Sequence, residues 1–497
     1  MTTIRPRWEW RTFGQRFGPA EDAFAALTAS GIQESDELYL LSTAGDNVKV
    51  RDDLMDIKVL QETDADGLQR WTPVMKAAFP LAAAEATRVA EALRLPAAAL
   101  ARADYSLDQF LADVVAPAGT IRVVAVHKRR VRYSVGGCMS EVSDVTAEGR
   151  SIRTIAIEAE DPAAVVAAVR TMGLGGYRNV DYPSGLSTLL DPRPARYAVV
   201  DVGTNSVKFH LGERQADGSW RTVADRAEVT RLGEGLEASG AISDAALART
   251  QQAIEGMVAE ARGQDALAIA AVGTAGLRAA GNADEVVAAI AATTGIRVEV
   301  IPGEEESRLA YLAVEAGLGI RGGSLVVFDT GGGSSQFTFG RDGRVDERFS
   351  LPVGAVRYTE QFGLDQAVTG DRLNEAMAAI AADLATLDER PRPDALVGMG
   401  GAITNLTAVM HRLATYDPDV VQGSVLDREE VDGQIERYRL LGVEGRRAIV
   451  GLQPKRADVI LAGACIVRTV LDKLDQASLT VSDRGLRHGV LLERFGT

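Results

Sequence analysis

Cysteine and histidine are scarce in this 497-residue chain, which has two cysteines and four histidines. Cys138 and Cys465 stand in no metal-ligand spacing, so the sequence argues against a disulfide framework or a zinc site and favours the reducing cytoplasm. The histidines are scattered, without a paired histidine or a His-Asp dyad, and the Walker pattern G-x-x-x-x-G-K-[ST] is absent. Histidine-based metal hydrolysis, a Ser-His-Asp triad and a P-loop are therefore all poorly supported.

Long apolar runs and excess positive charge are also missing. No stretch of about 18 apolar residues occurs, and the N-terminus has no apolar core behind its charges, so we expect neither a membrane span nor an export signal. The formal net charge is −15, which argues against a general nucleic-acid or anionic-membrane binder. With 46% hydrophobic and 25% charged residues, the composition is that of a globular protein with two or three domains.

Residues 1–181 contain strand-like segments in which charged and apolar residues alternate. These segments are 8–13, 38–42, 48–51, 56–60, 121–135 and 152–160. Because side chains alternate along a strand, the basic residues of each strand are expected to share one face. They are Lys49, Arg51, Lys58, Arg122, Lys128, Arg130 and Arg132. Two interpretations fit this pattern: a closed sheet with a polar interior suited to a multiply charged anion, or a half-exposed sheet with solvated charges.

The same region resembles the CYTH family of triphosphate tunnel metalloenzymes. The resemblance is carried by the segments 9–13, 48–51, 57–58, 128–132 and 157–160. It implies an α+β antiparallel eight-stranded tunnel whose basic residues hold triphosphate or polyphosphate and whose glutamates hold a divalent metal. That family opens with Glu-x-Glu-x-Lys, whereas this chain has Arg7-Trp8-Glu9-Trp10-Arg11. A cation replaces the first metal-binding glutamate, so anion binding is better supported than hydrolysis in the tunnel.

Residues 182–196 hold three prolines with serine and glycine, so we expect a linker between domains. After it comes a strand ending at Asp201, a polar turn and a second strand, and the same design returns at Asp329, 128 positions later. The turn residues are Gly203, Thr204, Asn205 and Ser206 in the first copy and Gly331, Gly332, Gly333, Ser334 and Ser335 in the second. Glycine-rich turns can aim backbone N–H groups at phosphate oxygens, and an aspartate beside phosphate makes sense with a divalent cation between them. A tight turn without a ligand is the alternative, which the duplication makes less favourable.

Two further segments carry charge at strand-to-helix turns. Arg278 stands near the start of a predicted helix, where a guanidinium can neutralise phosphate oxygens, although a lone arginine is more often a surface residue. The segment 304–306 places three glutamates in the first turn of a predicted helix. The helix dipole explains part of this acidity, and a hydrolase without a histidine also needs a carboxylate general base.

The C-terminal region resembles the exopolyphosphatase/guanosine pentaphosphate phosphatase family. Its motifs fall in the expected order at residues 201–206, 231–236, 274–282, 303–309, 329–335, 351–356, 398–402, 456–463 and 485–489. The resemblance implies a two-lobed α/β actin-like core (ASKHA, ribonuclease H-like), with two facing loops that grip a phosphate chain. The predicted organisation is a tunnel-like domain (1–181), a linker (182–196) and two lobes (197–322 and 323–497).

The resemblance also implies site residues and a cofactor. Glu306 is the implied general base, and Mg²⁺ is expected on Asp329, with Asp201 and Glu306 as further carboxylates. Phosphate contacts are expected from Gly203, Thr204, Asn205, Ser206, Arg278, Gly331, Gly332, Gly333, Ser334 and Ser335. A homodimer is implied as well.

One departure from the family concerns Gln336, which stands where relatives have a glutamate after Gly-Gly-Gly-Ser-Thr. Three functions therefore stay open: hydrolysis of terminal phosphates from polyphosphate, removal of the 5′ phosphate of guanosine pentaphosphate, and polyphosphate binding without turnover.

Overall fold

The computed structural model describes residues 6–42, 46–64, 67–95 and 100–496. The chain divides into two compact units, Met1–Val300 with Glu493–Thr497 and Ile301–Leu492. The first unit holds an eight-stranded barrel and a five-stranded sheet, and the second holds a six-stranded sheet with its helices. No helix within the described residues is long and apolar enough to span a membrane.

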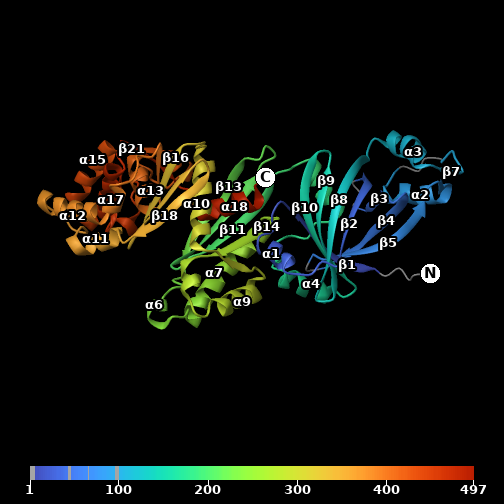
Figure 1. The fold of residues 1–497 in the computed structure, drawn as a ribbon, viewed down its shortest axis with the longest axis horizontal. Helices are drawn as coiled ribbons and strands as arrows, with labels where there is room; N and C mark the ends of the chain where they lie inside the picture. Colours follow the sequence, from blue (N-terminus) through green and yellow to red (C-terminus); the bar gives the residue numbers. More distant parts are fainter. Residues whose placement is uncertain (1–5, 43–45, 65–66, 96–99, 497) are drawn as a thin grey trace. The chain divides into compact units, whose positions relative to one another are not determined.

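The barrel is a closed ring of antiparallel strands in the order β1-β10-β9-β8-β2-β3-β4-β5, and β5 pairs back with β1 (Figure 1). Its strands are β1 (Arg7–Gly14), β2 (Gly31–Leu41), β3 (Asn47–Arg51), β4 (Leu54–Thr63), β5 (Gln69–Ala78), β8 (Arg122–Val135), β9 (Cys138–Ala147) and β10 (Arg150–Ala159). Around them lie β6 (Leu81–Ala82), β7 (Asp104–Tyr105), α1 (Pro19–Ala25), α2 (Ala83–Ala92), α3 (Leu107–Phe110), η1 (Leu111–Val115), η2 (Ala116–Ala118) and α4 (Pro162–Thr171).

Closure turns one face of every barrel strand inward, and strand β8 shows the consequence. Lys128 and Arg130 are buried, whereas their neighbours His127 and Arg129 are exposed. The closed sheet with a polar interior is therefore confirmed, and the half-exposed sheet is wrong. Strands β5 and β9 were missed, because β5 contains a proline and β9 is rich in serine, threonine and acidic residues.

The expected linker at 182–196 is wrong over most of its length, because Tyr182–Leu190 forms helix α5. Asp181 caps the helix by accepting a hydrogen bond from the Ser184 N–H at 2.7 Å, and Pro183 lies in the first turn, where a missing N–H costs nothing. The helix buries Tyr182 and Leu186 against barrel residues such as Tyr39. Proline therefore marks a helix start here, and α5 belongs to the wall of the barrel domain.

The five-stranded sheet has the order β13-β12-β11-β14-β15. Its strands are β11 (Ala195–Val202), β12 (Ser206–Arg214), β13 (Trp220–Val229), β14 (Ala268–Gly273) and β15 (Val298–Val300), and its helices are α6 (Leu236–Ser239), α7 (Asp244–Gly263), α8 (Ala275–Ala279) and α9 (Ala283–Thr294). Ala198 and Val200 on β11 point into a core that also holds Ile254 of α7 and Ile290 of α9. Helices α7 and α9 thus cover one face of the sheet (Figure 1).

The barrel and this sheet are joined by backbone hydrogen bonds within the first unit. The Arg178 N–H donates to the Leu267 carbonyl at 2.9 Å, and the Ile269 N–H donates to the Gly176 carbonyl at 2.8 Å. On the barrel side, the Asn179 side chain accepts from the Arg11 N–H at 2.7 Å. The segment after α4 therefore extends the edge of the sheet while remaining bonded to β1.

The six-stranded sheet of the second unit has the order β18-β17-β16-β19-β21-β20. Its strands are β16 (Ser324–Thr330), β17 (Ser335–Arg341), β18 (Arg344–Leu351), β19 (Ala395–Met399), β20 (Val425–Asp427) and β21 (Ser478–Ser482). Its helices are α10 (Gly303–Leu318), α11 (Ala355–Phe362), α12 (Gly370–Asp383), η3 (Ala385–Leu387), α13 (Gly401–Met410), α14 (Pro418–Val421), α15 (Arg428–Arg439), α16 (Val443–Arg447), η4 (Pro454–Arg456), α17 (Ile460–Lys473) and α18 (Leu486–Phe495), whose last residues, from Glu493, belong to the first unit. In both sheets three antiparallel strands precede a parallel one, which agrees with the predicted duplication.

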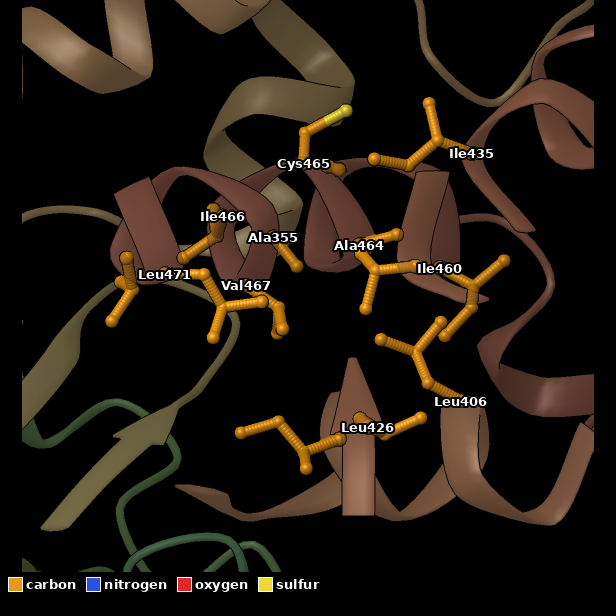
Figure 2. Close-up of a cluster of buried hydrophobic side chains, with 14 of the residues drawn as sticks. Ala355, Leu406, Leu426, Ile435, Ile460, Ala464, Cys465, Ile466, Val467 and Leu471 are labelled. Carbon is orange, nitrogen blue, oxygen red and sulfur yellow. The ribbon is translucent and has the colours of Figure 1, made fainter. Parts of the chain in front are cut away.

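Both faces of this second sheet are covered, because side chains on β16 alternate between two cores. Val326 and Phe328 face a large core centred on α17, in which Ile460 and Val467 are completely or almost completely buried (Figure 2). Leu325 and its alternate neighbours pack instead against α10. Helix α10 therefore lies in the second unit, although the predicted boundary at 322/323 placed it in the first lobe. The division into a tunnel domain and two lobes otherwise stays a prediction.

Candidate active site

Three polar turns of the first unit converge on Thr204, in the loop between β11 and β12. The Gly233 N–H donates to the Thr204 carbonyl at 2.8 Å, and a Cβ on Gly233 would lie 2.3 Å from the Thr204 methyl group. A Cβ on Gly276 would lie 2.9 Å from the Thr204 hydroxyl. Both glycines are therefore required for the turns to approach so closely. The loop exposes Thr204 and Asn205, as a phosphate-binding loop requires.

Arg278 belongs to the same group of turns. Its N–H donates to the carbonyl of Thr274 at 3.1 Å, and the Thr274 N–H donates to the Val202 carbonyl at 3.3 Å, at the end of β11. The arginine side chain is exposed. The structure thus brings Arg278 to the strand end that carries the Gly203–Ser206 turn.

Asp201 is buried, and its carboxylate lies 3.5 Å from the ammonium of Lys208, its partner across the β11–β12 pair. Lys208 was missed as a site residue, although its place seven residues after Asp201 on the second hairpin strand would have revealed the pair. A protein cation therefore balances part of the charge of Asp201.

In the second unit, Asp329 is the next-to-last residue of strand β16 and lies beside Gly400. Gly400 has φ +89°, and a Cβ there would lie 1.9 Å from the Asp329 Oδ1 atom. A Cβ on the next glycine, Gly401, would lie 2.6 Å from the Arg456 Nη2 atom. The missing side chain therefore leaves room for this guanidinium. Asp329 and Gly400 lie at the carboxyl end of the parallel pair β16–β19, where α/β sheets place their ligands.

The Gly331–Ser335 turn is held by the segment that follows β18. The Ala355 N–H donates to the Gly331 carbonyl at 2.9 Å, the Val356 N–H donates to the Gly332 carbonyl at 2.8 Å, and Gly333 faces open space. Ser335 differs from the prediction, because its hydroxyl is buried and donates to the Val353 carbonyl at 2.7 Å. This side chain stabilises the turn and cannot also reach a phosphate.

Ser334 and Gln336 stand on the accessible side of the turn. The Gln336 side-chain amide is exposed and donates to the Ser334 hydroxyl at 2.9 Å. Gln336 pairs with Asp329 across β16 and β17. The glutamine therefore orients a hydroxyl of the predicted phosphate loop, a role that the sequence did not suggest.

The three glutamates at the start of α10 differ in their surroundings. Glu305 forms a two-pronged ion pair with Arg308, at 2.8 and 2.6 Å, and Glu304 is exposed. Glu306 is half-buried in the first turn of the helix. The ion pair with Arg308 makes Glu305 a poor candidate for the general base.

The barrel encloses a cavity of about 420 Å³, lined by more cations than carboxylates. The basic lining residues are Arg11, Lys49, Arg51, Lys58, Lys128, Arg130 and Arg132, and the acidic ones are Glu9, Glu141 and Glu158. Six of the seven predicted polyanion residues therefore line one space. Arg122 does not line it, since its guanidinium pairs with Glu148 at 2.7 Å and Asp191 at 2.8 Å.

A single buried carboxylate, Glu37, is shared by several of these cations. It lies 2.9 Å from the Lys128 ammonium and 3.1 Å from that of Lys49, and Arg130 also binds it. Burial alone would raise the pKa of Glu37, but the charges of Lys128, Lys49 and Arg130 hold it well below its ordinary value. Burial, together with the nearby Lys49, lowers the pKa of Lys128 well below its usual range. The cluster is therefore poised for a further anion.

Two residues near the Glu37 cluster, Tyr39 and Tyr182, were also missed. Their rings stack at 5.1 Å with an interplanar angle of 14°, and the Lys128 ammonium lies 3.6 Å from the Tyr182 ring centre. Glu37 follows the polar residues 33–36 of β2, so nothing local distinguished it from its neighbours. Nothing local predicted Tyr182 either, since α5 brings it from a distant segment.

The carboxylates of the cavity are largely neutralised by arginine. Arg11 pairs with Glu9 at 2.8 Å and with Glu141 at 3.1 Å, and Arg7 lies 3.4 Å from Glu158. Burial and the nearby Glu9 raise the pKa of Glu158. Arg7 and Arg11 thus pair with the glutamates that would otherwise be available to a metal. This agrees with the loss of the first glutamate of the tunnel motif.

Two sheets of matching strand order, each with an aspartate and a polar turn near the end of its first strand, are typical of an actin-like core. The model of the Ppx/GppA phosphatase family matches residues 213–497, more than half of the chain, so the chain belongs to that family. It is 28% identical to exopolyphosphatase 2 of Mycobacterium tuberculosis strain H37Rv over 324 residues, covering 61% of this chain and 99% of that protein.

Two further relatives agree with this assignment. A guanosine-5′-triphosphate,3′-diphosphate pyrophosphatase of Photobacterium profundum is 30% identical over 308 residues, covering 61% of this chain and 60% of that protein. The crystal structure of the type II variant of the Aquifex aeolicus Ppx/GppA phosphatase matches with a TM-score of 0.57 and 32% identity, covering 60% of this chain and 99% of that chain. The family match therefore covers the core from residue 213 onward and leaves the barrel outside it.

Proposed function

We propose that the protein is an exopolyphosphatase, which removes terminal phosphates from inorganic polyphosphate and releases orthophosphate. The observation that carries the proposal is the arrangement of the second unit, in which Gly400 makes room for Asp329 beside the Gly331–Gly333 turn. The relatives named as exopolyphosphatases support the same reaction.

The chemistry assigned to this chain's residues is in-line hydrolysis. Glu306 accepts a proton from water, the water oxygen forms a bond to the terminal phosphorus, and the bridging P–O bond breaks to release orthophosphate and a shortened chain. The N–H groups of Gly331 and Gly203 already donate to the Ser334 and Ser206 carbonyls, at 2.9 and 3.1 Å. The phosphate oxygens are therefore assigned to the remaining N–H groups of the two turns and to Arg278, which stabilise their charge.

A divalent metal fits the donor set of the second unit. The Asp329 carboxylate is the type of oxygen ligand that Mg²⁺ prefers, and the missing Cβ of Gly400 leaves room for its Oδ1 atom. Asp329 would hold the ion, with Glu306 and Asp201 as further carboxylates. The ion supplies charge neutralisation on the transferred phosphate.

For the barrel, we propose capture of the polyphosphate chain in a degenerate CYTH-like tunnel without hydrolysis. Seven basic side chains line its cavity, and arginines pair with the glutamates that would otherwise hold a metal. A chain held there by several phosphates at once would bind more tightly as its length increases. A cytoplasmic homodimer is the expected setting.

The second candidate is a guanosine pentaphosphate 5′-phosphatase, supported by the relatives named as guanosine-5′-triphosphate,3′-diphosphate pyrophosphatases. Orthophosphate release with Mg²⁺ from long-chain polyphosphate and from guanosine pentaphosphate distinguishes the two. If the protein is an exopolyphosphatase, we expect faster orthophosphate release from polyphosphate than from guanosine pentaphosphate, and loss of activity when a chelator removes the metal. Release only from guanosine pentaphosphate would favour the second candidate, and tight polyphosphate binding without release would favour the non-catalytic binder.

A further inference from the structure

A second cavity of the first unit, with a volume of about 410 Å³, lies where the barrel domain meets the edge of the five-stranded sheet. Its walls come from the end of β1, from α5, from the starts of β11 and β14, from the end of β12 and from the end of α18. The backbone bonds between 176–178 and 267–269 fix these walls to one another. None of the residues assigned above to polyphosphate chemistry lines it, so it is a separate site.

The charge of this cavity is opposite to that of the protein. Its lining includes five arginines and no aspartate or glutamate, in a chain with 69 acidic and 54 basic residues. The arginines are Arg16, Arg150, Arg193, Arg214 and Arg494. Arg494 is paired with Glu299 at 2.6 Å, whereas Arg16 and Arg193 are exposed. The cavity is therefore complementary to an anion.

The rest of the lining is mostly apolar and aromatic, with a few uncharged polar side chains. It includes Phe13, Tyr177, Tyr197 and Phe495. The Tyr197 and Phe495 rings stack at 4.7 Å with an interplanar angle of 20°, and Phe13 meets Tyr182 edge-on at 5.5 Å. Rings held in fixed orientations favour a flat aromatic ligand over a flexible acyl chain, because ring stacking needs planar faces.

We propose that this cavity, called the joint cavity, binds a purine nucleotide, with the base against the aromatic wall and the phosphates toward the arginines. A volume of about 410 Å³ lies within the usual range for small-molecule sites, which is roughly 300–1,000 Å³. Aromatic walls with a few well-placed cationic groups are the usual composition of such sites.

The location gives the nucleotide a route to influence the core. Ala195 and Tyr197 of the cavity wall begin strand β11, which ends at the Gly203–Ser206 turn. Ala268 begins β14, which leads to Arg278. A ligand in the joint cavity therefore contacts the starts of both strands that carry the phosphate turns of the first unit. The binding proposal stands whether or not the core hydrolyses polyphosphate.

The test is calorimetric titration of the full-length protein with ADP. Thr188 is exposed on α5 and lines the joint cavity, so the larger side chain of Thr188→Trp should block the entrance of the cavity. Ser187, the preceding residue on the same helix, is exposed and does not line the cavity, so Ser187→Trp is the matched control. We expect Thr188→Trp to weaken ADP binding by about tenfold or more, and Ser187→Trp to leave it unchanged.

The contribution of charge is tested with the double variant Arg16→Ala plus Arg193→Ala, which should also weaken ADP binding while polyphosphate hydrolysis persists. The barrel variant Arg130→Ala plus Arg132→Ala should bind ADP like the wild type, because it alters the other cavity. ADP binding that resists Thr188→Trp, or no binding of ADP at all, would overturn the proposal. Binding of adenosine as tight as that of ADP, or binding of laurate in place of ADP, would overturn it as well.

Discussion

Gly400→Ala is the substitution that tests the metal carboxylate most selectively. Gly400 follows strand β19 and has φ 89° and ψ 171°, a region that is used almost only by glycine and costs an L-residue about 1–3 kcal/mol. The added methyl group would lie 1.9 Å from the Asp329 Oδ1 atom, whereas contacts of real Cβ atoms are essentially never under 3.0 Å. The carboxylate or the turn must therefore move by about 1 Å, the difference between these two distances.

A displacement of that size at a reacting group costs about 100-fold in rate. We expect Gly400→Ala to lower kcat for orthophosphate release by about 100-fold, with polyphosphate binding to the barrel unchanged. Steady-state phosphate release, thermal unfolding and polyphosphate binding are measured on the same preparation.

The control is Gly433→Ala, which lies in the interior of α15 in the same unit with nothing within 4 Å of its added methyl group. Alanine in a helix is favoured over glycine, so this variant should be as active as the wild type and equally or slightly more stable. A Gly400→Ala enzyme that folds and keeps kcat within threefold of the control would refute the assigned role of Asp329.

Three further predictions concern the barrel and the turn. Glu37→Gln should lower the free energy of unfolding by about 3 kcal/mol, because its cations are left unbalanced, and tripolyphosphate should restore the melting temperature. In the wild type the pKa of Glu37 is depressed by folding, so this contribution to stability should be lost as the pH falls below 4.5. Equal acid sensitivity of both proteins would contradict the prediction. Arg130→Ala plus Arg132→Ala should weaken binding of long polyphosphate more than of short chains, with exposed Arg129→Ala as control; equal effects would argue against capture. Ser335→Ala should lower the free energy of unfolding by about 1–3 kcal/mol in chemical denaturation, because the buried Ser335 hydroxyl donates to the Val353 carbonyl. The KM should not rise. A raised KM would instead support the phosphate contact that the sequence predicted for Ser335.

Local signals predicted much of the fold. Alternation on β8 predicted an interior face with Lys128 and Arg130, and the Asp201 and Asp329 hairpins lie in sheets of matching order. These features depend on strand periodicity and turn chemistry, which are local properties of the sequence. The match to the family model, at residues 213–497, confirmed the predicted family and spans all the ordered motifs after the first.

What the sequence could not provide depends on tertiary contacts. Helix α5 looked like a linker because three prolines favour extended chain, yet Asp181 capping and burial of Tyr182 stabilise a helix. Ser335 looked like a phosphate contact until Val353 proved to be its acceptor. Glu37 neutralises cations that come from β3 and β8, a set that only the closed ring assembles.

The central claim, hydrolysis with Glu306 as the base, is tested most directly by orthophosphate release from long-chain polyphosphate with Mg²⁺. The comparison is between the wild type, Glu306→Gln and the control Glu304→Gln, which removes an exposed charge from the same helical turn. We predict that Glu306→Gln lowers kcat by about 10²–10⁴-fold while polyphosphate binding persists, and that Glu304→Gln stays near wild type. Unchanged turnover in Glu306→Gln would contradict the account.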